Sequence, residues 1–290
     1  EEGTELYIEA GTIIKGKLDP TDVNDNTSAL IITRGAKIFA EGTALRPIIF
    51  TAESDDINNP SDLTSADRGE WGGLILLGKA RINTTTGVGQ IEGIATEEPR
   101  GAYGGNDDND NSGVLRYVSI RHGGSEIGSG NEINGLTMGA VGDGTTIEYV
   151  EVYSNLDDGY EWFGGTVNAK YLVSAFCGDD GFDYDEGYRG KNQYVFAIMG
   201  NDFAGRIAEQ DGGTQPEDGQ PYAIPVFYNT TYIGPGITAT PQGDGGQAMI
   251  FRDNAGGKYY NSIITDYNGA TGGVAVTVED IPSGEDSRAR

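Results

Sequence analysis

The chain has 290 residues and a formal net charge of −26, and 37% of its residues are hydrophobic. The negative charge argues against nucleic acid and anionic membranes as partners, because both bind basic surfaces, and it favours cations. An acidic surface that serves only solubility, or life in a salty habitat, is the alternative explanation. A single cysteine, Cys177, excludes an intrachain disulfide. No apolar run approaches the roughly 18 residues of a membrane-spanning helix, so we expect no direct membrane insertion of this segment.

Strand-like segments recur along the chain with glycines and polar turns between them. Glycine accounts for 47 residues without the G-X-Y period of collagen, which predicts many short strands and tight turns. The matching segments, in chain order, are Leu6–Ile14 with Leu30–Ile38 at an offset of 24, Leu115–Ile120 with Ile147–Val152 at 32, Tyr149–Gly165 with Tyr171–Gly187 at 22, Tyr171 with Tyr194 at 23, and Phe227–Ile233 with Tyr259–Thr265 at 32.

These offsets predict an all-β chain folded as a right-handed parallel β-helix, a solenoid of about ten coils with loop insertions. Such coils contain two or three short strands, and the longer offsets indicate coils that carry loops. Insertions are expected at Asp19–Ser28 and Ser54–Arg68, which are rich in turn residues. Residues 1–290 are expected to form one domain of a longer precursor. A β-sandwich or propeller is the alternative, but the Asn-Gly pairs at Asn134 and Asn268 lack flanking strands.

Two acidic segments repeat one another at an offset of 22: "LDDGYEWFGG" (Leu156–Gly165) and "GDDGFDYDEG" (Gly178–Gly187). In a β-helix, equivalent side chains of neighbouring coils stack roughly 4.8 Å apart. The aromatic residues of the two segments are expected to form an inward ladder, with Tyr160 on Phe182 and Trp162 on Tyr184. The carboxylates would then form an outer stripe of candidate metal ligands: Asp157, Asp158, Glu161, Asp179, Asp180 and Asp183.

Carboxylates so close together repel one another unless bulk water screens them, cationic side chains lie between them or a metal binds them. The sequence leaves three interpretations of the stripe open. Calcium binds oxygen ligands at roughly 2.3–2.6 Å, and twice that distance is close to the coil spacing, so stacked carboxylates fit a calcium bridge. Alternatively, the acids cap turns through hydrogen bonds or ion pairs, with Lys170, Arg189 and Lys191 as nearby cations. The third alternative is catalysis by paired carboxylates.

A second candidate calcium loop lies in "GGNDDNDNSG" (Gly104–Gly113), where Asp108, Asp110 and Ser112 alternate before a glycine. This alternation is typical of calcium loops. The twelfth position counted from Asp108 is Ser119, so the distal Glu of an EF-hand is missing. An ordinary polar turn is the alternative interpretation.

Conventional catalytic motifs are missing from the sequence. The only histidine, His122, is expected to be a turn or core residue, and one His with one Cys cannot form the usual protein zinc site. Polygalacturonase-type β-helix enzymes carry aspartates on adjacent coils, but their Gly-His-Gly turn and Arg-x-Lys strand are absent. For a calcium-dependent lyase, Arg206 and Arg252 join Arg189 and Lys191 as loosely supported candidates for the base.

Five longer segments together carry a family resemblance: Arg68–Asn83, Ile91–Ile94, Tyr103–Gly124, Asn131–Val173 and Gly178–Tyr194. They resemble a family of exported β-helix proteins from marine Bacteroidetes and some proteobacteria, many of them surface lipoproteins or secretion-system cargo. The resemblance implies the β-helix fold and a secreted or outer-surface location, and it implies no particular reaction.

Together these observations predict an extracellular or cell-surface binding or assembly module that is stabilised by calcium. Polysaccharides or other cell-surface components are the expected partners, because exposed aromatic rings stack on sugars. The candidate ligand-binding residues are Trp71, Tyr103, Tyr188 and Arg189. The alternative function is a polysaccharide lyase or glycoside hydrolase that uses the acidic stripe between Asp157 and Asp185; the main hypothesis assigns no catalytic residue.

Overall fold

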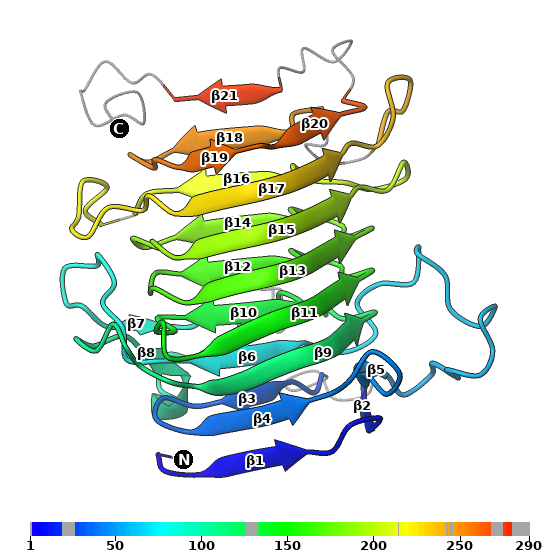
Figure 1. Ribbon diagram of the computed structural model, residues 1–290, viewed down its shortest axis with the longest axis horizontal. Coiled ribbons are helices and arrows are strands. Elements are labelled where there is room, and N and C mark those ends of the chain that lie inside the picture. Colours follow the sequence, from blue (N-terminus) through cyan, green and yellow to red (C-terminus); the bar gives the residue numbers. More distant parts are fainter. Residues whose placement is uncertain are drawn as a thin grey trace.

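The computed structural model describes residues 2–18, 27–125, 133–213, 215–241, 243, 246–267 and 275–279. Short strands wind upward in stacked coils, with the amino-terminal coil at one end of the stack and the carboxyl-terminal strand β21 (Val276–Val278) at the other (Figure 1). The predicted right-handed parallel β-helix is confirmed. No helix in the described ranges is long and apolar enough to cross a membrane.

One side of the solenoid is an eleven-stranded sheet. Its main path runs through β1 (Glu5–Ile8), β4 (Lys37–Glu41), β9 (Gly113–Arg121), β11 (Thr146–Tyr153), β13 (Asn168–Ala175), β15 (Lys191–Ile198), β17 (Val226–Ile233) and β19 (Lys258–Tyr260). The shorter strands β2 (Ile13–Gly16), β5 (Ile48–Ala52) and β20 (Ile263–Thr265) pair beside this path. Every pairing in this sheet is parallel, which excludes the β-sandwich and propeller alternatives.

The other side is an eight-stranded parallel sheet that contains one strand from each coil. Together with β21 it comprises β3 (Leu30–Ile32), β6 (Leu74–Leu77), β10 (Leu136–Gly139), β12 (Tyr160–Phe163), β14 (Phe182–Asp185), β16 (Ala208–Asp211) and β18 (Met249–Arg252). The described residues therefore form eight coils rather than about ten. Insertions between strands take up the remaining length.

The repeat offsets predict the strand register in most of the chain. Tyr160 pairs with Phe182 and Trp162 with Tyr184, as the offset of 22 requires, and the offsets of 23 and 32 are also found in the eleven-stranded sheet. The match at 24 is wrong, because Leu6 pairs with Ile38 rather than with its sequence equivalent. The second segment of that match begins in the other sheet, which has the same apolar alternation.

The aromatic ladder of the repeated segments faces inward as predicted. Tyr160, Trp162, Phe182 and Tyr184 are fully buried. The rings of Tyr160 and Phe182 lie 5.0 Å apart and stack. Trp162 stacks on Tyr188 at 5.1 Å instead of on Tyr184, its partner in the register. Offset stacking of this kind adds to the stability that burial of the rings supplies.

A large insertion that the repeats do not reveal lies between β6 and β9. It contains the antiparallel pair β7 (Gly89–Gln90) and β8 (Ala102–Tyr103), with a 3₁₀ turn at Pro99–Gly101. Figure 1 shows the pair beside β6. The insertion covers the outer face of the eight-stranded sheet with a second hydrophobic cluster, which includes Ile75, Leu77, Ile82, Ile91 and Tyr103.

The two predicted insertions have different outcomes. Residues 54–68 form turns and bends without a strand, as expected. Most of the other insertion, residues 19–26, lies outside the described residues.

Candidate metal centre

The acidic stripe lies on the outer face of the eight-stranded sheet, next to the region that the insertion covers. Glu161 of β12 is in register with Asp183 of β14. The pairing of Tyr184 with Gln210 places Asp183 beside Glu209 of β16. Asp158 and Asp180 precede β12 and β14 in equivalent turns. The stacking predicted from the 22-residue offset is thus confirmed, and the stripe continues onto a third coil.

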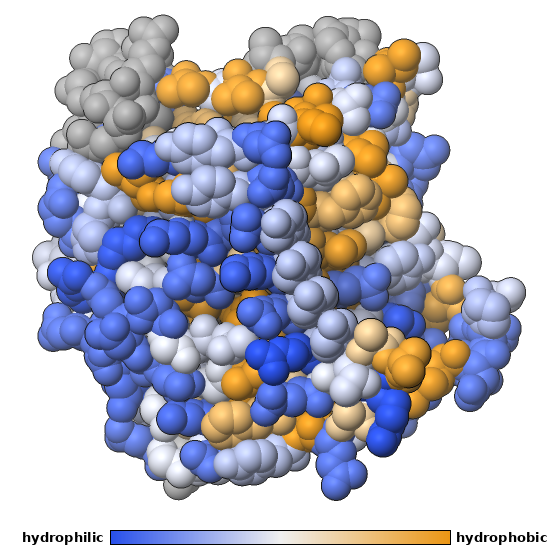
Figure 2. Space-filling view, viewed as in Figure 1, coloured by the Kyte–Doolittle hydropathy of each residue, from blue (hydrophilic) through white to orange (hydrophobic). Residues whose placement is uncertain are grey.

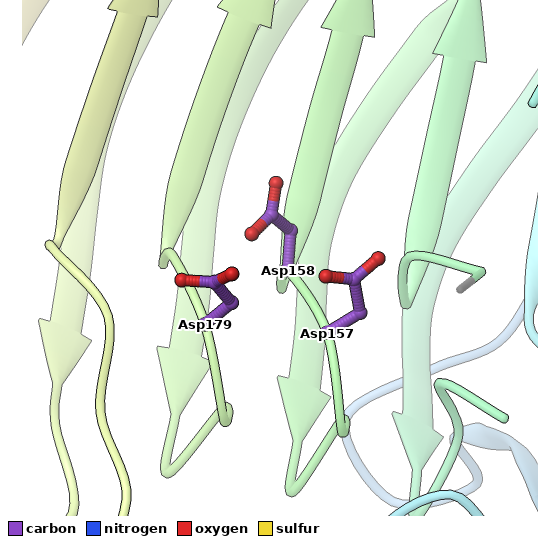
Figure 3. Close-up of side chains that lie close together, drawn as sticks. All are labelled: Asp157, Asp158 and Asp179. Atoms are coloured by element: carbon purple, nitrogen blue, oxygen red, sulfur yellow. The ribbon is translucent and has the colours of Figure 1, made fainter. Parts of the chain in front are cut away.

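Three groups of carboxylates on this stripe have oxygen atoms that all lie within 4.8 Å of one another. The first is the most open of the three, and Figure 3 shows how its side chains gather where two adjacent coils turn. The groups are Asp157, Asp158 and Asp179; Asp158, Glu161 and Asp183; and Asp180, Asp183 and Glu209.

Burial and mutual repulsion disfavour the ionised forms of these acids. Burial is the largest cause, and it raises the pKa of Asp158, Glu161, Asp180 and Asp183 well above the ordinary values. Neighbouring carboxylates raise these pKa values further. At neutral pH the stripe therefore requires protons, hydrogen-bond donors or cations close to its oxygen atoms.

Backbone amides satisfy part of this requirement. The carboxylate of Asp158 accepts a hydrogen bond from the backbone N–H of Asp180 at 2.8 Å, across the coil boundary. One coil further on, Asp180 accepts in the same way from the backbone N–H of Arg206. These two acids cap turns, as one of the sequence-based alternatives proposed.

Arginines neutralise the carboxyl-terminal end of the stripe. Arg206 and Arg252 both form ion pairs with Glu209. Arg252 also donates to Asp211 through two nitrogen atoms, at 2.6 and 2.9 Å. The cations are therefore not the predicted ones: Lys170 and Lys191 lie on the other sheet, and Arg189 binds elsewhere.

The middle group, Asp158, Glu161 and Asp183, forms no ion pair in the described part of the chain, although Arg252 acts on Asp183 at longer range. Its side-chain donor is the Asn134 amide, whose Nδ2 contacts Glu161 and also lies 3.1 Å from Glu92. The Oδ1 atom of Asp183 is buried and has no hydrogen-bond partner among the described residues. The same holds for Oδ1 of Asn134, a residue that is 1% exposed. These oxygen atoms fit the ligand preference of a hard cation.

The sequence did not predict a role in the site for Glu92, Asn134, Glu209 or Asp211. The alternating acids of "AEQD" (Ala208–Asp211) resemble "FDYD" (Phe182–Asp185) and could have indicated the third coil. The offset there is 26 rather than 22, which hid the match. Glu92 belongs to the unpredicted insertion, and no local pattern connects it to Glu161.

The side chains of the second predicted calcium loop have partners within the protein, and calcium binding there stays a prediction. Asp108 is held by two guanidinium groups, with Arg81 Nε at 2.9 Å and Arg189 Nη2 at 2.5 Å. Partial burial alone would raise the pKa of Asp108, but its hydrogen bonds to Arg81 and Arg189 lower that pKa to about 2. Asp110 is buried and accepts a hydrogen bond from Ser112 at 3.2 Å. Neither Asp108 nor Asp110 belongs to a carboxylate group that could hold a metal among the described residues.

The predicted exposure of the candidate sugar-stacking rings is wrong. Trp71 and Tyr103 are each 2% exposed and Tyr188 is fully buried, so none of them offers a ring face to a ligand. Their polar atoms bind within the protein: Trp71 to the Arg121 carbonyl, Tyr103 to Glu186, and Tyr188 to the Val167 carbonyl. Arg189 is bound to Asp108 and to three backbone carbonyls.

His122 is a buried turn residue, in agreement with the simplest interpretation of a lone histidine. It is 4% exposed, its backbone is left-handed with φ of 58°, and its Nδ1 lies 2.6 Å from the Asp67 carbonyl oxygen.

Comparison with known families agrees with this architecture. The model of the pectate-lyase like beta helix domain matches residues 1–284, so the chain belongs to this family. No curated protein and no solved structure matches the chain. Family membership supports the parallel β-helix and is consistent with a carbohydrate-related function. The narrower resemblance to exported proteins of marine bacteria stays a prediction.

Proposed function

We propose that this protein is a secreted or cell-surface β-helix that binds calcium at its acidic stripe and acts as a glycan-binding module. The observation that carries the calcium proposal is the group formed by Asp158, Glu161 and Asp183, in which a buried carboxylate oxygen has no partner among the described residues. A bound cation would supply the missing positive charge.

Calcium suits this group better than magnesium does. Magnesium keeps several waters and requires near-ideal octahedral geometry, whereas calcium accepts irregular cages of carboxylate and amide oxygens. Here three carboxylates converge from two adjacent coils, and the Asn134 amide lies beside them on a third. Calcium would link these coils and relieve the repulsion that raises the pKa of each acid.

The glycan part of the proposal is supported by the family and by the solenoid itself. A pectate-lyase like β-helix is consistent with a carbohydrate-related function, and a solenoid offers a long repetitive surface to an extended ligand. The alternative of a polysaccharide lyase is less well supported, because Arg206 and Arg252, its candidate bases beside the stripe, are both held in ion pairs with Glu209. A glycoside hydrolase would need only paired carboxylates and is tested by the release of sugar ends.

Thermal unfolding with calcium and with a chelator tests the calcium site. A ligand that binds only the native state stabilises it by about 3 kcal/mol at roughly 100-fold its Kd, so calcium should raise the Tm of the wild type. Asp183→Asn should lose most of this increase. In chelator the same variant should be at least as stable as the wild type, because one buried like charge has gone.

Asp108→Asn is the matched control for this experiment. It removes a carboxylate that already has two arginine partners, so it should lower the Tm equally with and without calcium. A wild-type Tm that does not respond to calcium, or an Asp183→Asn variant that keeps the full response, would contradict the proposed site. Release of reducing or unsaturated sugar ends that is lost in Asp180→Asn would favour the enzyme instead.

A further inference from the structure

A column of four tyrosines runs across the outer face of the eleven-stranded sheet. Tyr117, Tyr149, Tyr171 and Tyr194 occupy equivalent positions on consecutive coils, and their rings stack with centroids 4.4, 4.3 and 4.9 Å apart. The rings are within 11° of parallel. Because each ring covers the face of the next, the column presents ring edges and hydroxyl groups to solvent.

The backbone at these positions is unusual for tyrosine. Each of the four residues has a left-handed backbone, with φ between 48° and 59°, in the middle of a strand. The next two coils have Asn229 and Asn261 at the equivalent position, also with positive φ. Asparagine tolerates this conformation well and a bulky residue does not. A side-chain role is therefore needed to explain the tyrosines, and stacking on one another is one such role.

The column borders a shallow groove of about 350 Å³ that is open to solvent. Tyr149, Tyr171 and Tyr194 are 37, 38 and 45% exposed. Val173 and Phe196 line the groove beside them, and Glu151 lies at its amino-terminal end. Figure 2 shows hydrophobic side chains gathered over the right-hand ends of β13, β15 and β17 on this same face.

From β13 onward, the strands of this sheet are opposite in charge to the molecule as a whole, whereas β11 before them carries Glu148 and Glu151. Acidic residues number 45 in the whole chain, yet β13, β15, β17, β19 and β20 contain none. The same strands carry Lys170, Lys191 and Lys258, which are exposed and form no ion pair within the described residues. Stacking of the rings alone would not require acids to be absent or lysines to be present.

We propose that this tyrosine–lysine face binds an extended anionic glycan. The proposal rests on the glycan-binding function proposed above and assigns it to the sheet opposite the acidic stripe. Tyrosine hydroxyls both donate and accept hydrogen bonds, as sugar hydroxyls require. Lysine ammonium groups supply charge-assisted hydrogen bonds to carboxylate or sulfate. Contacts repeated from coil to coil suit a linear repeating polymer.

A second copy of this chain is a less suitable occupant of the face. Each copy carries a net charge of −26, and a symmetric contact between the carboxyl-terminal halves would bring lysine against lysine. An anionic chain instead meets the lysines with opposite charge.

Calorimetric titration of the calcium-loaded full chain tests the proposal with chondroitin sulfate and alginate as probes and dextran as the neutral control. The two acidic probes distinguish sulfate from carboxylate recognition. Binding of at least one of them, weakened by added NaCl, is the expected result. Lys191→Glu should weaken binding about tenfold or more, since it replaces a charge-assisted contact by repulsion.

Two further variants distinguish a loss of binding at this face from a loss caused by the change in net charge or by unfolding. Lys17→Glu makes the same charge change at an exposed position beyond β2, and it should change affinity by less than about twofold. Tyr171→Phe keeps the stacked ring and removes one hydroxyl, so it should weaken binding while the Tm stays unchanged.

The possible results have distinct meanings. The face is not the binding site if Lys191→Glu and Lys17→Glu lower the affinity for acidic glycans equally. The same follows if neither the Lys191 nor the Tyr171 variant changes that affinity. In both cases glycan binding itself would still stand. Preferential binding of dextran would lead to the same conclusion. If none of the three polymers binds, the glycan part of the proposed function fails as well. Concentration-dependent self-association abolished by Lys191→Glu would show that a second copy occupies the face.

Discussion

Identical side chains in this protein have opposite electrostatic behaviour because their neighbours differ. Asp108 has two arginine partners, which lower its pKa to about 2 against the effect of partial burial. Asp183 is surrounded by other carboxylates, and burial followed by their repulsion raises its pKa well above the ordinary value. Of the two, only Asp183 keeps a buried carboxylate oxygen without a hydrogen-bond partner among the described residues, although both lie in sequences that resemble calcium ligands.

Glu186 provides a test of burial at a single residue. Burial, and then repulsion from Asp185, raises its pKa from 4.5 to about 7, and Tyr103 donates a hydrogen bond to it. A raised folded-state pKa contributes stability below pH 4.5 that is lost as the pH rises through about 7. In chelator, Glu186→Gln should therefore lose less stability than the wild type between about pH 5 and pH 8, by up to about 3 kcal/mol. Urea unfolding at both pH values measures this difference.

Glu98→Gln is the control for the pH experiment. Its hydrogen bonds to the Arg100 side chain and backbone lower the pKa of Glu98 to about 2. The stability linked to a lowered pKa is lost only as the pH falls below the ordinary value, so this variant should follow the wild type over the same interval. Parallel curves for the wild type and Glu186→Gln would show that the carboxyl group of Glu186 titrates normally.

At the scale of strands, neighbouring coils approach so closely that some positions exclude even a methyl group. Gly113 begins β9 with φ of +110°, and a Cβ atom there would lie 1.8 Å from the Ile38 carbonyl oxygen of β4. Gly87, in the loop before β7, has φ of +68° and nothing within 4 Å of the corresponding position. The two glycines share a positive φ and differ in the space around them.

Alanine substitutions at these two glycines distinguish the cost of a steric clash from the cost of a positive φ. Gly113→Ala should lower the free energy of unfolding by well over 2 kcal/mol, because strain at φ is added to a clash with backbone. Gly87→Ala should cost about 1 kcal/mol, from the left-handed conformation alone. Urea unfolding midpoints of the two variants give the comparison, and equal losses would show that the coils separate to accommodate the methyl group.

At the scale of the whole molecule, acidic and basic strands lie on different sheets. Strands β12, β14 and β16 of the eight-stranded sheet carry the acidic stripe. On the eleven-stranded sheet, β13, β15, β17, β19 and β20 contain no acid, and β13, β15 and β19 carry one lysine each. A cation on one side and an anionic polymer on the other are therefore compatible within one solenoid.

The net charge of −26 predicts a dependence of stability on salt. Self-repulsion destabilises the compact state, and salt screens it beyond about 10 Å at 0.1 M. In chelator the Tm should rise with NaCl and level off. Millimolar calcium should then raise the Tm further at constant ionic strength, because a bound ion acts on acids closer together than the screening length. A calcium effect reproduced by NaCl of equal ionic strength would indicate screening alone.

The sequence by itself determined the solenoid, most of its register, the inward aromatic ladder and the stacked acids of β12 and β14. It could do so because residues one coil apart in space are also equivalent in the repeat, so local pattern and three-dimensional contact coincide. The predicted register was wrong, or was missed, where coil neighbours are not equivalent positions of the repeat. At Leu6–Ile14 the apparent match belongs to the other sheet, and at Glu209 the offset changes to 26.

Only the tertiary structure decided which acids form ion pairs with arginines and which aromatic rings are exposed to solvent. Arg189 reaches Asp108 across 81 residues, and Arg252 reaches Asp211 across 41. The insertion between β6 and β9 buries Tyr103, while the stacked column leaves Tyr171 exposed. These contacts depend on how insertions and long side chains fold back over the coils, and that packing leaves no periodic trace in the sequence.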